Sequence, residues 1–378
     1  MLAVVPRVHV PWTPDRRTSR GVTPLDLGLI VGAFALILVG AEVFTNGIEW
    51  LGVKLNLSQG ATGSILAALG TATPETLIPI VAILFTNTAD ADEIGVGAIL
   101  GAPFMLATLV MLLIGVTAFA LRRRRGRTTL RVDAAHAKRD LSFFLVLYTL
   151  ALALALLPRD LHFLKDYVGW IFLPSYFLYL YLVLRTPKVS AVDVEEAREE
   201  QEAFEELTFA TYLRRLGAAV RPTRPPFWLV LAQTLISFGG IVLGAKFFAA
   251  FVEDFSHAMN FNTLLVALIL APLATELPEA ANSLIWTKEG KDVIALGNVA
   301  GAMVFQSTVP VTIGVLLTPW ELGQFGTLAS IFALLSGILI YVQLRTRTRE
   351  NALPLSSLML GGSLYVVFLG YVLWSVLT

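Results

Sequence analysis

The sequence contains no cysteine in its 378 residues, which excludes disulfides, thiolate metal sites and cysteine nucleophiles. Histidine is scarce as well, because only four occur and none belongs to a His-Glu-x-x-His pair. That kind of metalloprotease site is therefore excluded, and no Ser-His or two-Asp constellation lies within an apolar run. We predict that the protein is not an enzyme and binds no cofactor. The histidines fall in predicted tails and loops, at His9, His136, His162 and His257.

Charged residues are also few. They make up 15% of the chain and cancel to a formal net charge of zero, whereas hydrophobic residues reach 56%. Apolar runs repeatedly attain the ~20 residues that cross a bilayer as a helix. We therefore predict an all-α, multi-pass integral membrane protein whose surroundings are the lipid bilayer and which binds no nucleic acid. Ten spans can be marked, at roughly 25–51, 58–86, 93–121, 141–158, 168–185, 226–252, 262–287, 291–318, 325–345 and 354–377.

These spans divide into two halves joined by a polar segment. Residues 1–23 are interpreted as a short, mobile tail, because they lack the apolar core and cleavage site of a signal peptide. We predict a first transmembrane repeat over 24–185, a cytoplasmic connecting segment over 186–225 and a second transmembrane repeat over 226–378. The acidic middle of the connecting segment is interpreted as a solvated helix rather than a cation sensor, since it lacks the turn glycine of an EF-hand loop.

Lysine and arginine are concentrated in the loops after the third, fifth, seventh and ninth spans. All four loops lie on one side of the membrane if ten spans alternate, and the positive-inside rule makes that side cytoplasmic. Both termini are then predicted to be external, although four arginines in the N-terminal tail oppose this orientation. We expect the protein in the plasma membrane, and the sequence leaves its oligomeric state open.

One short motif occurs twice, deep inside two apolar runs. The first copy is Gly-Thr-Ala-Thr-Pro-Glu and the second is Ala-Thr-Glu-Leu-Pro-Glu. Thr71 precedes Glu75 by four residues, and Thr275 precedes Glu279 by the same spacing, so each pair lies on one face of a helix. The repetition predicts two equivalent polar sites within the membrane.

A proline stands directly before the glutamate in each copy. A proline inside a helix removes one hydrogen bond and frees the carbonyl four residues back, which belongs to Gly70 or Ala274. Carboxylate, hydroxyl and carbonyl oxygens are the hard ligands that a small cation prefers. An ionised carboxylate at the bilayer centre costs about 2.5–3.5 kcal/mol, so it normally faces a cavity or a partner. Lys246 is the only basic residue well inside a span, so at least one of the two glutamates needs a cation or a proton.

Other short patterns recur at nearly the same offset and indicate an internal repeat. Gly40-Ala41 is followed 204 residues later by Gly244-Ala245, and the Gly97/Gly101 pair recurs 200 residues later as Gly297/Gly301. Five spans per half is an odd number, so the halves are predicted to sit in opposite orientations. Inverted repeats with helices broken near the midplane are typical of transporters.

These motifs resemble those of the cation/Ca²⁺ antiporter superfamily, whose best-known members are sodium/calcium exchangers. Its members carry two inverted repeats, each with a G-T-S-L-P-E-like motif followed on the next helix by a G-N-x-x-G-S-N-like motif. The second motif reads Gly97–Pro103 in one half and Gly297–Met303 in the other. The resemblance covers nearly the whole chain. It implies an alternating-access antiporter in which both motif glutamates bind the cation, their threonines lie beside them, and spans one and six slide.

The sequence also departs from the superfamily pattern. Pro103 and Met303 stand where members carry Asn or Asp, and neither side chain can bind a hard cation. In compensation, Glu276 is an added acid three residues from Glu279, so both carboxylates can face one cavity. The candidate cation ligands are Glu75, Glu279, Thr71, Thr275, Glu276, Gly70, Ala274, Asn298, Thr73 and Gln306.

The expected activity is export of Ca²⁺ in exchange for Na⁺, with H⁺ as the runner-up driving ion. Carboxylates that share a poorly hydrated site repel one another, so protons can empty the site as well as sodium. A cation channel is the alternative from another class, because rings of acidic groups also select cations. Obligatory exchange against a counter-ion would distinguish an antiporter from a pore.

Two charged residues occupy equivalent places in spans one and six. Glu42 and Lys246 either pair with each other near the ion path or extend separately toward an interface, as long side chains near a span end do. The sequence leaves both interpretations open, and neither residue is placed among the ligands.

Overall fold

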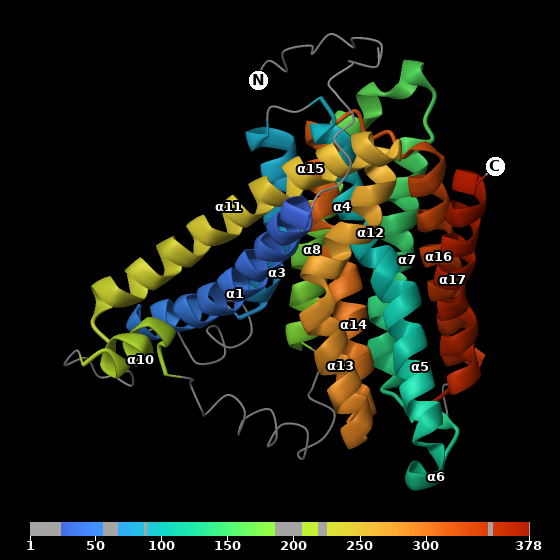
Figure 1. Ribbon diagram of the computed structural model, residues 1–378. Helices are drawn as coiled ribbons and strands as arrows, with labels where there is room; N and C mark the ends of the chain where they lie inside the picture. The colour runs from blue at the N-terminus through green and yellow to red at the C-terminus, as the bar shows by residue number, and fades with distance from the viewer. Residues whose placement is uncertain are drawn as a thin grey trace.

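The computed structural model describes residues 24–55, 67–86, 89–185, 206–217, 225–346 and 351–377. These residues are almost entirely helical, with one two-stranded sheet (Figure 1). The elements are α1 (Pro24–Lys54), α3 (Ala67–Phe85), α4 (Ala91–Met105), the π-helical turn η2 (Leu106–Val110), α5 (Met111–Ala120), α6 (Arg122–Arg125), β1 (Thr129–Arg131), α7 (Ala134–Ala155), the 3₁₀ turn η3 (Arg159–Leu161), α8 (Phe163–Arg185), α10 (Thr208–Arg215), α11 (Phe227–Met259), α12 (Thr263–Thr275), α13 (Leu277–Glu289), α14 (Asp292–Gln306), α15 (Val309–Leu317), α16 (Gly323–Thr346), β2 (Ala352–Pro354) and α17 (Leu355–Leu377).

Several of these helices are long and apolar enough to cross a membrane. Among the described residues six single helices or continuous rods meet that test, and a seventh span results if α12 and α13 count as one bent span. Helices lie within all ten ranges predicted from the sequence, but the remaining ones do not meet the test. The chain is therefore a multi-pass helical protein, and the count of ten spans stays a prediction. The acidic stretch 195–205 of the connecting segment lies outside the described residues.

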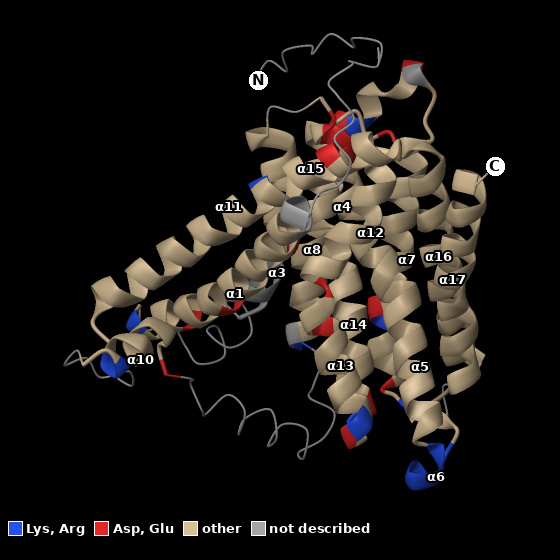
Figure 2. Ribbon diagram, in the orientation of Figure 1, with Lys and Arg blue, Asp and Glu red and all other residues tan. Residues whose placement is uncertain are grey.

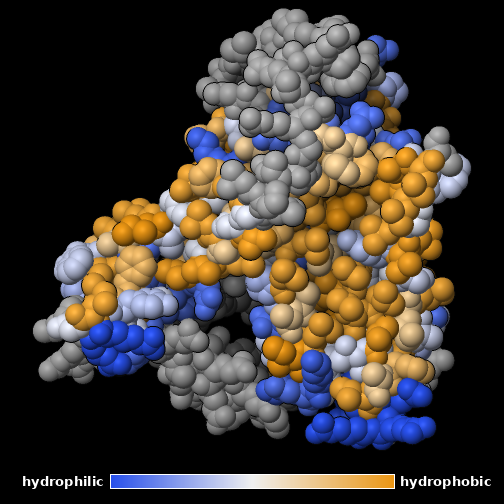
Figure 3. Space-filling model, in the orientation of Figure 1, coloured by the Kyte–Doolittle hydropathy of each residue, from blue (hydrophilic) through white to orange (hydrophobic). Residues whose placement is uncertain are grey.

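The molecule has apolar flanks and two charged ends (Figures 2 and 3). Large side chains on the flanks are exposed, for example Trp170 at 60% and Leu235 at 60%, as expected for a surface that contacts lipid. We call the end that carries α6 and the arginines of α10 the basic end. The opposite end, which carries Asp90, Glu93 and Glu253, is called the acidic end. Helix α1 begins and α17 ends toward this acidic end (Figure 1).

Helices α1 and α11 pack closely along their lengths and run obliquely to the other helices (Figure 1). A Cβ atom at Gly40 would lie 2.9 Å from Ile241 of α11, and one at Gly244 would lie 2.9 Å from Ile37 of α1. Small residues let two helices approach this closely, which is how helices associate in a membrane. The Gly-Ala repeats of the sequence are thus the contact surface between these two helices.

A buried polar network joins the same helices toward the basic end. The Gln233 amide donates to Asn46 Oδ1 at 2.8 Å and to the Val43 carbonyl at 3.0 Å. Asn46 Oδ1 also accepts from the Thr208 backbone N–H at 3.1 Å, at the start of α10. Because buried amides bonded in this way resist separation, α1, α10 and α11 form one unit, which we call the arm. The other helices are called the body.

Within the body, the backbones of α4 and α12 approach each other closely. A Cβ atom at Gly97 or Gly101 would collide with the backbone carbonyl of Leu264 or Leu268, so only glycine fits at these two positions. Their counterparts on α14 have no such neighbour, since Gly297 has open space around it. The repeated glycines therefore have different roles in the two halves.

Helix α7 begins after Asp133, whose side chain caps it. Asp133 Oδ1 accepts from the backbone N–H groups of Ala135 and His136 at 2.9 and 3.1 Å. Partial burial acts to raise the pKa of Asp133, but hydrogen bonds and charge from His136 outweigh it and hold this pKa below its ordinary value. The cap is therefore ionised at neutral pH, when it binds the helix N-terminus best.

A buried ion-pair network connects elements at the basic end. Asp292, at the start of α14, pairs with Arg125 and with Arg127, the latter at 2.7 Å, and accepts from the Arg131 backbone N–H at 2.9 Å. Its side chain is 0% exposed. Strand β1 pairs in turn with β2 in antiparallel register, so the network connects the segment after α5 both to α14 and to the start of α17.

Replacing Asp292 with alanine should lower the free energy of unfolding by about 3–5 kcal/mol, because two arginines would lose the partner that offsets their burial. The measurement is denaturant unfolding of the purified protein in detergent. Asp160→Ala, at an exposed carboxylate, is the matched control and should change stability by less than about 0.5 kcal/mol. Equal effects of the two substitutions would contradict the structural role assigned to Asp292.

Candidate cation-binding site

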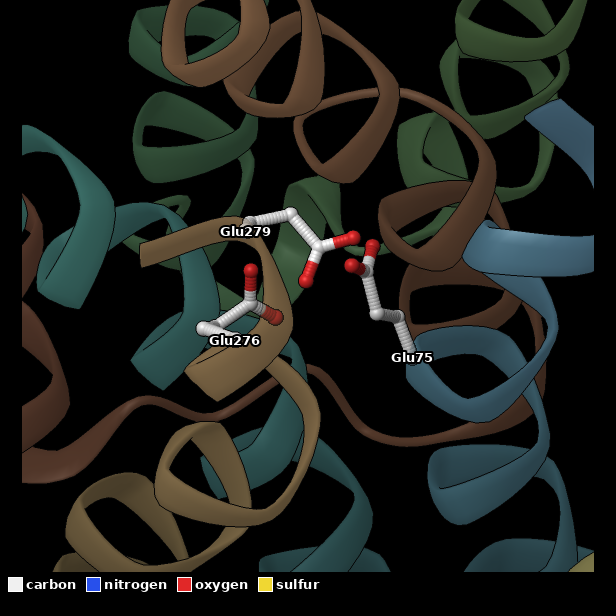
Figure 4. A group of neighbouring side chains, drawn as sticks. All are labelled: Glu75, Glu276 and Glu279. Carbon is white, nitrogen blue, oxygen red and sulfur yellow. The ribbon is translucent and has the colours of Figure 1, made fainter. Parts of the chain in front are cut away.

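Three glutamates from distant parts of the chain meet inside the body (Figure 4). Glu75 comes from α3, Glu276 from the junction of α12 and α13, and Glu279 from the first turn of α13. One carboxylate oxygen from each lies within 4.8 Å of the other two. Glu276 is fully buried, Glu75 is 7% exposed and Glu279 is half-buried, so only Glu279 of the three is partly exposed to solvent. Figure 4 shows the Glu75 and Glu279 carboxylates pointing toward each other.

Local sequence explains how two of these glutamates come from adjacent turns. Helix α12 ends at Thr275, α13 begins at Leu277, and the two helices are bent by 54°. Pro278 lies in the first turn of α13, where its missing N–H costs nothing, and it cannot continue α12. Glu279 therefore sits at a helix N-terminus, where the helix dipole stabilises a carboxylate. The predicted break is confirmed at Pro278, whereas Pro74 lies inside the continuous helix α3.

Neutral donors surround Glu276. The Thr275 hydroxyl donates to Oε1 at 2.8 Å, and the Gln306 amide donates to Oε2 at 2.7 Å. The Gln306 side chain also lies near the Glu75 carboxylate, so one amide is close to two of the three acids. Among the described residues, Glu279 Oε2 and Gln306 Oε1 are buried oxygens that have no hydrogen-bond partner. Buried oxygens are rarely left without a partner, so these two atoms are suited to bind a cation.

The spacing of the carboxylates fits a hard cation. Ca²⁺ binds oxygen at about 2.3–2.6 Å, so ligand oxygens around it lie up to about 5 Å apart, which accommodates atoms within 4.8 Å of one another. If all three groups were ionised without a counter-charge, each pair would repel by at least about 3 kcal/mol at an effective dielectric constant of 20. Such a cluster is therefore stable only where a cation or protons neutralise part of its charge.

Other residues predicted from the sequence lie around this cluster. Thr275 is buried beside Glu276, whereas the side chain of Thr71 lies outside the described residues. Asn298 donates its amide to the Glu279 carbonyl at 3.3 Å and to Ser283 Oγ at 3.1 Å, so it holds α14 against α13. Gly70 and Thr73 lie on α3 and Ala274 on α12, and their direct binding of a cation stays a prediction.

The structure also separates residues that could have belonged to the site. Met303 is fully buried in the apolar core, in keeping with its inability to bind a hard cation. Glu42 and Lys246 are both exposed, and within the described residues no ion pair joins them. These positions favour the interpretation that each side chain extends separately toward an interface, rather than the one in which the two side chains pair with each other.

One neighbour of the cluster was not identified from the sequence. Tyr176 of α8 lies close enough to Glu75 to interact with it electrostatically. Its ring packs edge-on against Phe305 of α14, with centroids 5.3 Å apart. Only the packing of α8 against the site brings this phenol to Glu75, since α8 carries no acidic motif that would draw attention to it.

Comparison with known proteins agrees with this geometry. The family described as "Sodium/calcium exchanger protein" matches residues 25–185 and 229–377, which together make up most of the chain. The chain belongs to the sodium/calcium exchanger family. This membership confirms the resemblance to the cation/Ca²⁺ antiporter superfamily, whose members are transporters and not enzymes.

Two curated members resemble the chain along much of its length. A protein named as the antiporter CaxA of Alkalimonas amylolytica is 27% identical over 297 residues, covering 77% of this chain and 80% of that protein. Vacuolar cation/proton exchanger 1 of Arabidopsis thaliana is 26% identical over 311 residues, covering 77% of this chain. The matched region spans only 61% of the length of the Arabidopsis protein.

Solved structures of two exchangers share the fold. The crystal structure of the H⁺/Ca²⁺ exchanger CAX superposes with a TM-score of 0.56 at 15% identity, covering 92% of this chain and 80% of that chain. A structure of the sodium-calcium exchanger NCX_Mj superposes with a TM-score of 0.51 at 17% identity, covering 92% of this chain and 99% of that chain. These likenesses place the chain in the exchanger fold.

Glu279→Gln should weaken Ca²⁺ binding by at least about 100-fold. The substitution keeps the shape of the side chain but removes one of three negative charges near the ion, and with it several kcal/mol of attraction. Calorimetric titration of the detergent-solubilised protein with Ca²⁺ measures the change. Glu289→Gln, at the exposed end of the same helix, is the matched control and should bind Ca²⁺ as the parent does. Equal affinities of Glu279→Gln and the parent would rule out this cluster as the binding site.

Proposed function

We propose that this protein is a secondary antiporter that exports Ca²⁺ in exchange for protons by alternating access. The observation that carries the proposal is the buried cluster of Glu75, Glu276 and Glu279, with oxygens within 4.8 Å of one another. Three carboxylates can neutralise a divalent cation. When the cation leaves, the same groups can accept protons, which relieves their mutual repulsion.

The loss of several polar side chains that a sodium site would need supports protons as the counter-ion. Sodium sites need several neutral oxygens, and Ala72, Pro103 and Met303 occupy positions where members of the superfamily carry polar side chains. The relative named as vacuolar cation/proton exchanger 1 agrees with this choice. The sequence favours sodium, and the position of Glu276 within one cluster with Glu75 and Glu279 moves the balance toward protons.

Sodium is the second candidate counter-ion. The Thr275 hydroxyl lies 2.8 Å from Glu276 Oε1, and the Gln306 amide oxygen is buried without a partner among the described residues. Both atoms are neutral oxygens that a monovalent cation could use beside one carboxylate. The two candidate counter-ions use the same binding residues. They differ in whether Ca²⁺ flux follows an imposed Na⁺ gradient or an imposed pH gradient.

For the transport cycle, we propose ten spans arranged as two inverted five-helix repeats. The cation binds where the two motif-bearing helices meet, and the arm slides across the body to expose the site to alternate sides. The basic end faces the cytoplasm by the positive-inside rule, which leaves the ends of the chain outside the cell membrane. Close packing of α1 against α11 supports movement of the arm as one piece.

Flux into proteoliposomes tests the proposal. Vesicles that contain a Ca²⁺ indicator are given H⁺, Na⁺ or K⁺ gradients in turn, and the expected result is Ca²⁺ movement that follows the pH gradient alone. Glu279→Gln should abolish the flux and Glu289→Gln should retain it, because only the first lies in the carboxylate cluster.

The other outcomes are equally distinct. Flux that follows the Na⁺ gradient and ignores pH would establish the second candidate. Ca²⁺ movement that needs no counter-ion and gives a measurable single-channel conductance would overturn antiport in favour of a pore.

A further inference from the structure

Asp90 joins the arm to the body at the acidic end. Its Oδ2 atom accepts from His257 Nε2, near the end of α11, at 2.8 Å. The same oxygen accepts from the Thr263 hydroxyl, at the start of α12, also at 2.8 Å. Asp90 itself precedes α4, and its backbone carbonyl accepts the first hydrogen bond of that helix, from Ile94. One carboxylate thus connects three helices from both halves of the chain.

Neighbouring bonds reinforce this junction. Glu253 of α11 lies near Asp90 and Ala89, so a second acid of the arm faces the start of α4. Glu93 of α4 accepts from the Leu264 N–H of α12 at 3.3 Å, which ties two body helices to each other. Asp90 and Glu93 are therefore both occupied as hydrogen-bond acceptors.

Below the junction, small and apolar residues form the interface between arm and body. Ala245, Ala249 and Phe248 of α11 are fully buried in a cluster with Ile78 of α3 and Ala267 of α12. Packing contacts of this kind are not directional, so the surface can shift with little loss of packing. The hydrogen bonds of Asp90 are directional and help to fix the position of the arm along this interface, beside the short connection 260–262 between α11 and α12.

The opposite end of the arm is separated from the body. In Figure 1, α1 and α11 run away from α13 and α14 toward the basic end, and Figure 3 shows a hollow between them on this face. The arm is thus held to the body at the acidic end and diverges from it at the basic end. This is the asymmetry that alternating access requires of a transporter open to one side.

We propose that Asp90, with His257 and Thr263, is the gate that keeps the cation site closed toward the acidic end. Its hydrogen bonds stabilise the observed position of the arm, and they must break before the arm can slide and admit solvent from that side. The proposal rests on the proposed alternating-access function. Asp90 is a positioning residue, since it acts on the site through the placement of α11 and does not touch the cation cluster.

Cysteine labelling tests the gate without a transport assay. The chain has no cysteine, so Thr275→Cys supplies a single thiol beside the carboxylate cluster. A membrane-impermeant thiol reagent is added from the acidic side of oriented vesicles, and the labelling rate is measured. In the Asp90→Ala background this rate should rise roughly tenfold, the factor expected when two hydrogen bonds to a carboxylate are lost.

Three further variants make the result specific. His257→Ala and Thr263→Val each remove one of the two bonds and should give intermediate rates, while retaining a folded protein by size-exclusion chromatography. Asp254→Asn is the matched control, since this neighbouring acid on α11 is exposed, and it should label as the parent does. A labelling rate that stays at the parental value in Asp90→Ala, or that rises equally in Asp254→Asn, would overturn the gate.

A locking experiment gives the converse result. Joining Asp90→Cys to His257→Cys with a short bifunctional thiol reagent should stop Ca²⁺ flux, and cleavage of the linker should restore it. Flux that continues at its full rate in the cross-linked protein would overturn the gate. If the parent exchanges no Ca²⁺ under any gradient, the proposed function fails instead, and the labelling rates still decide whether Asp90 controls access.

Discussion

Mutual repulsion of three buried carboxylates is the constraint on which the site depends. With oxygens within 4.8 Å of one another in an apolar interior, Glu75, Glu276 and Glu279 cannot all remain ionised without a counter-charge. The surrounding structure reduces the repulsion with neutral donors, an amide from Gln306 and a hydroxyl from Thr275. These donors do not remove the repulsion, because among the described residues no basic side chain forms an ion pair with the cluster. Either a bound cation or protons are needed to offset the remaining charge.

Backbone geometry explains why the repulsion is tolerated at this place. The chain turns by 54° between α12 and α13, because Pro278 cannot continue the first helix, and the turn leaves Glu279 at a helix N-terminus. There the helix dipole favours negative charge. Helix α3 contributes its glutamate without such a break, so the two motif copies reach the same point by different local structures.

Two different kinds of contact hold the arm. Glycines at Gly40 and Gly244 bring α1 and α11 into close contact, and an apolar surface that includes Ala245 and Ala249 packs the pair against the body. Such contacts are strong in sum but are not directional. Hydrogen bonds at Asp90 depend on distance and direction, so they favour the observed position of the arm.

The sequence alone determined the helical membrane class, the repeated motif and the glutamates that the structure gathers in one cluster, because apolar run length, helical spacing and proline placement are local properties. It also indicated Gln306 as an oxygen donor, yet it could not show that this amide donates to Glu276. Only the tertiary structure brought Tyr176 near Glu75, left Glu42 and Lys246 exposed, and joined Asp90 to a histidine 167 residues away. Those contacts follow from how the helices pack against one another, and no spacing along the chain encodes that packing.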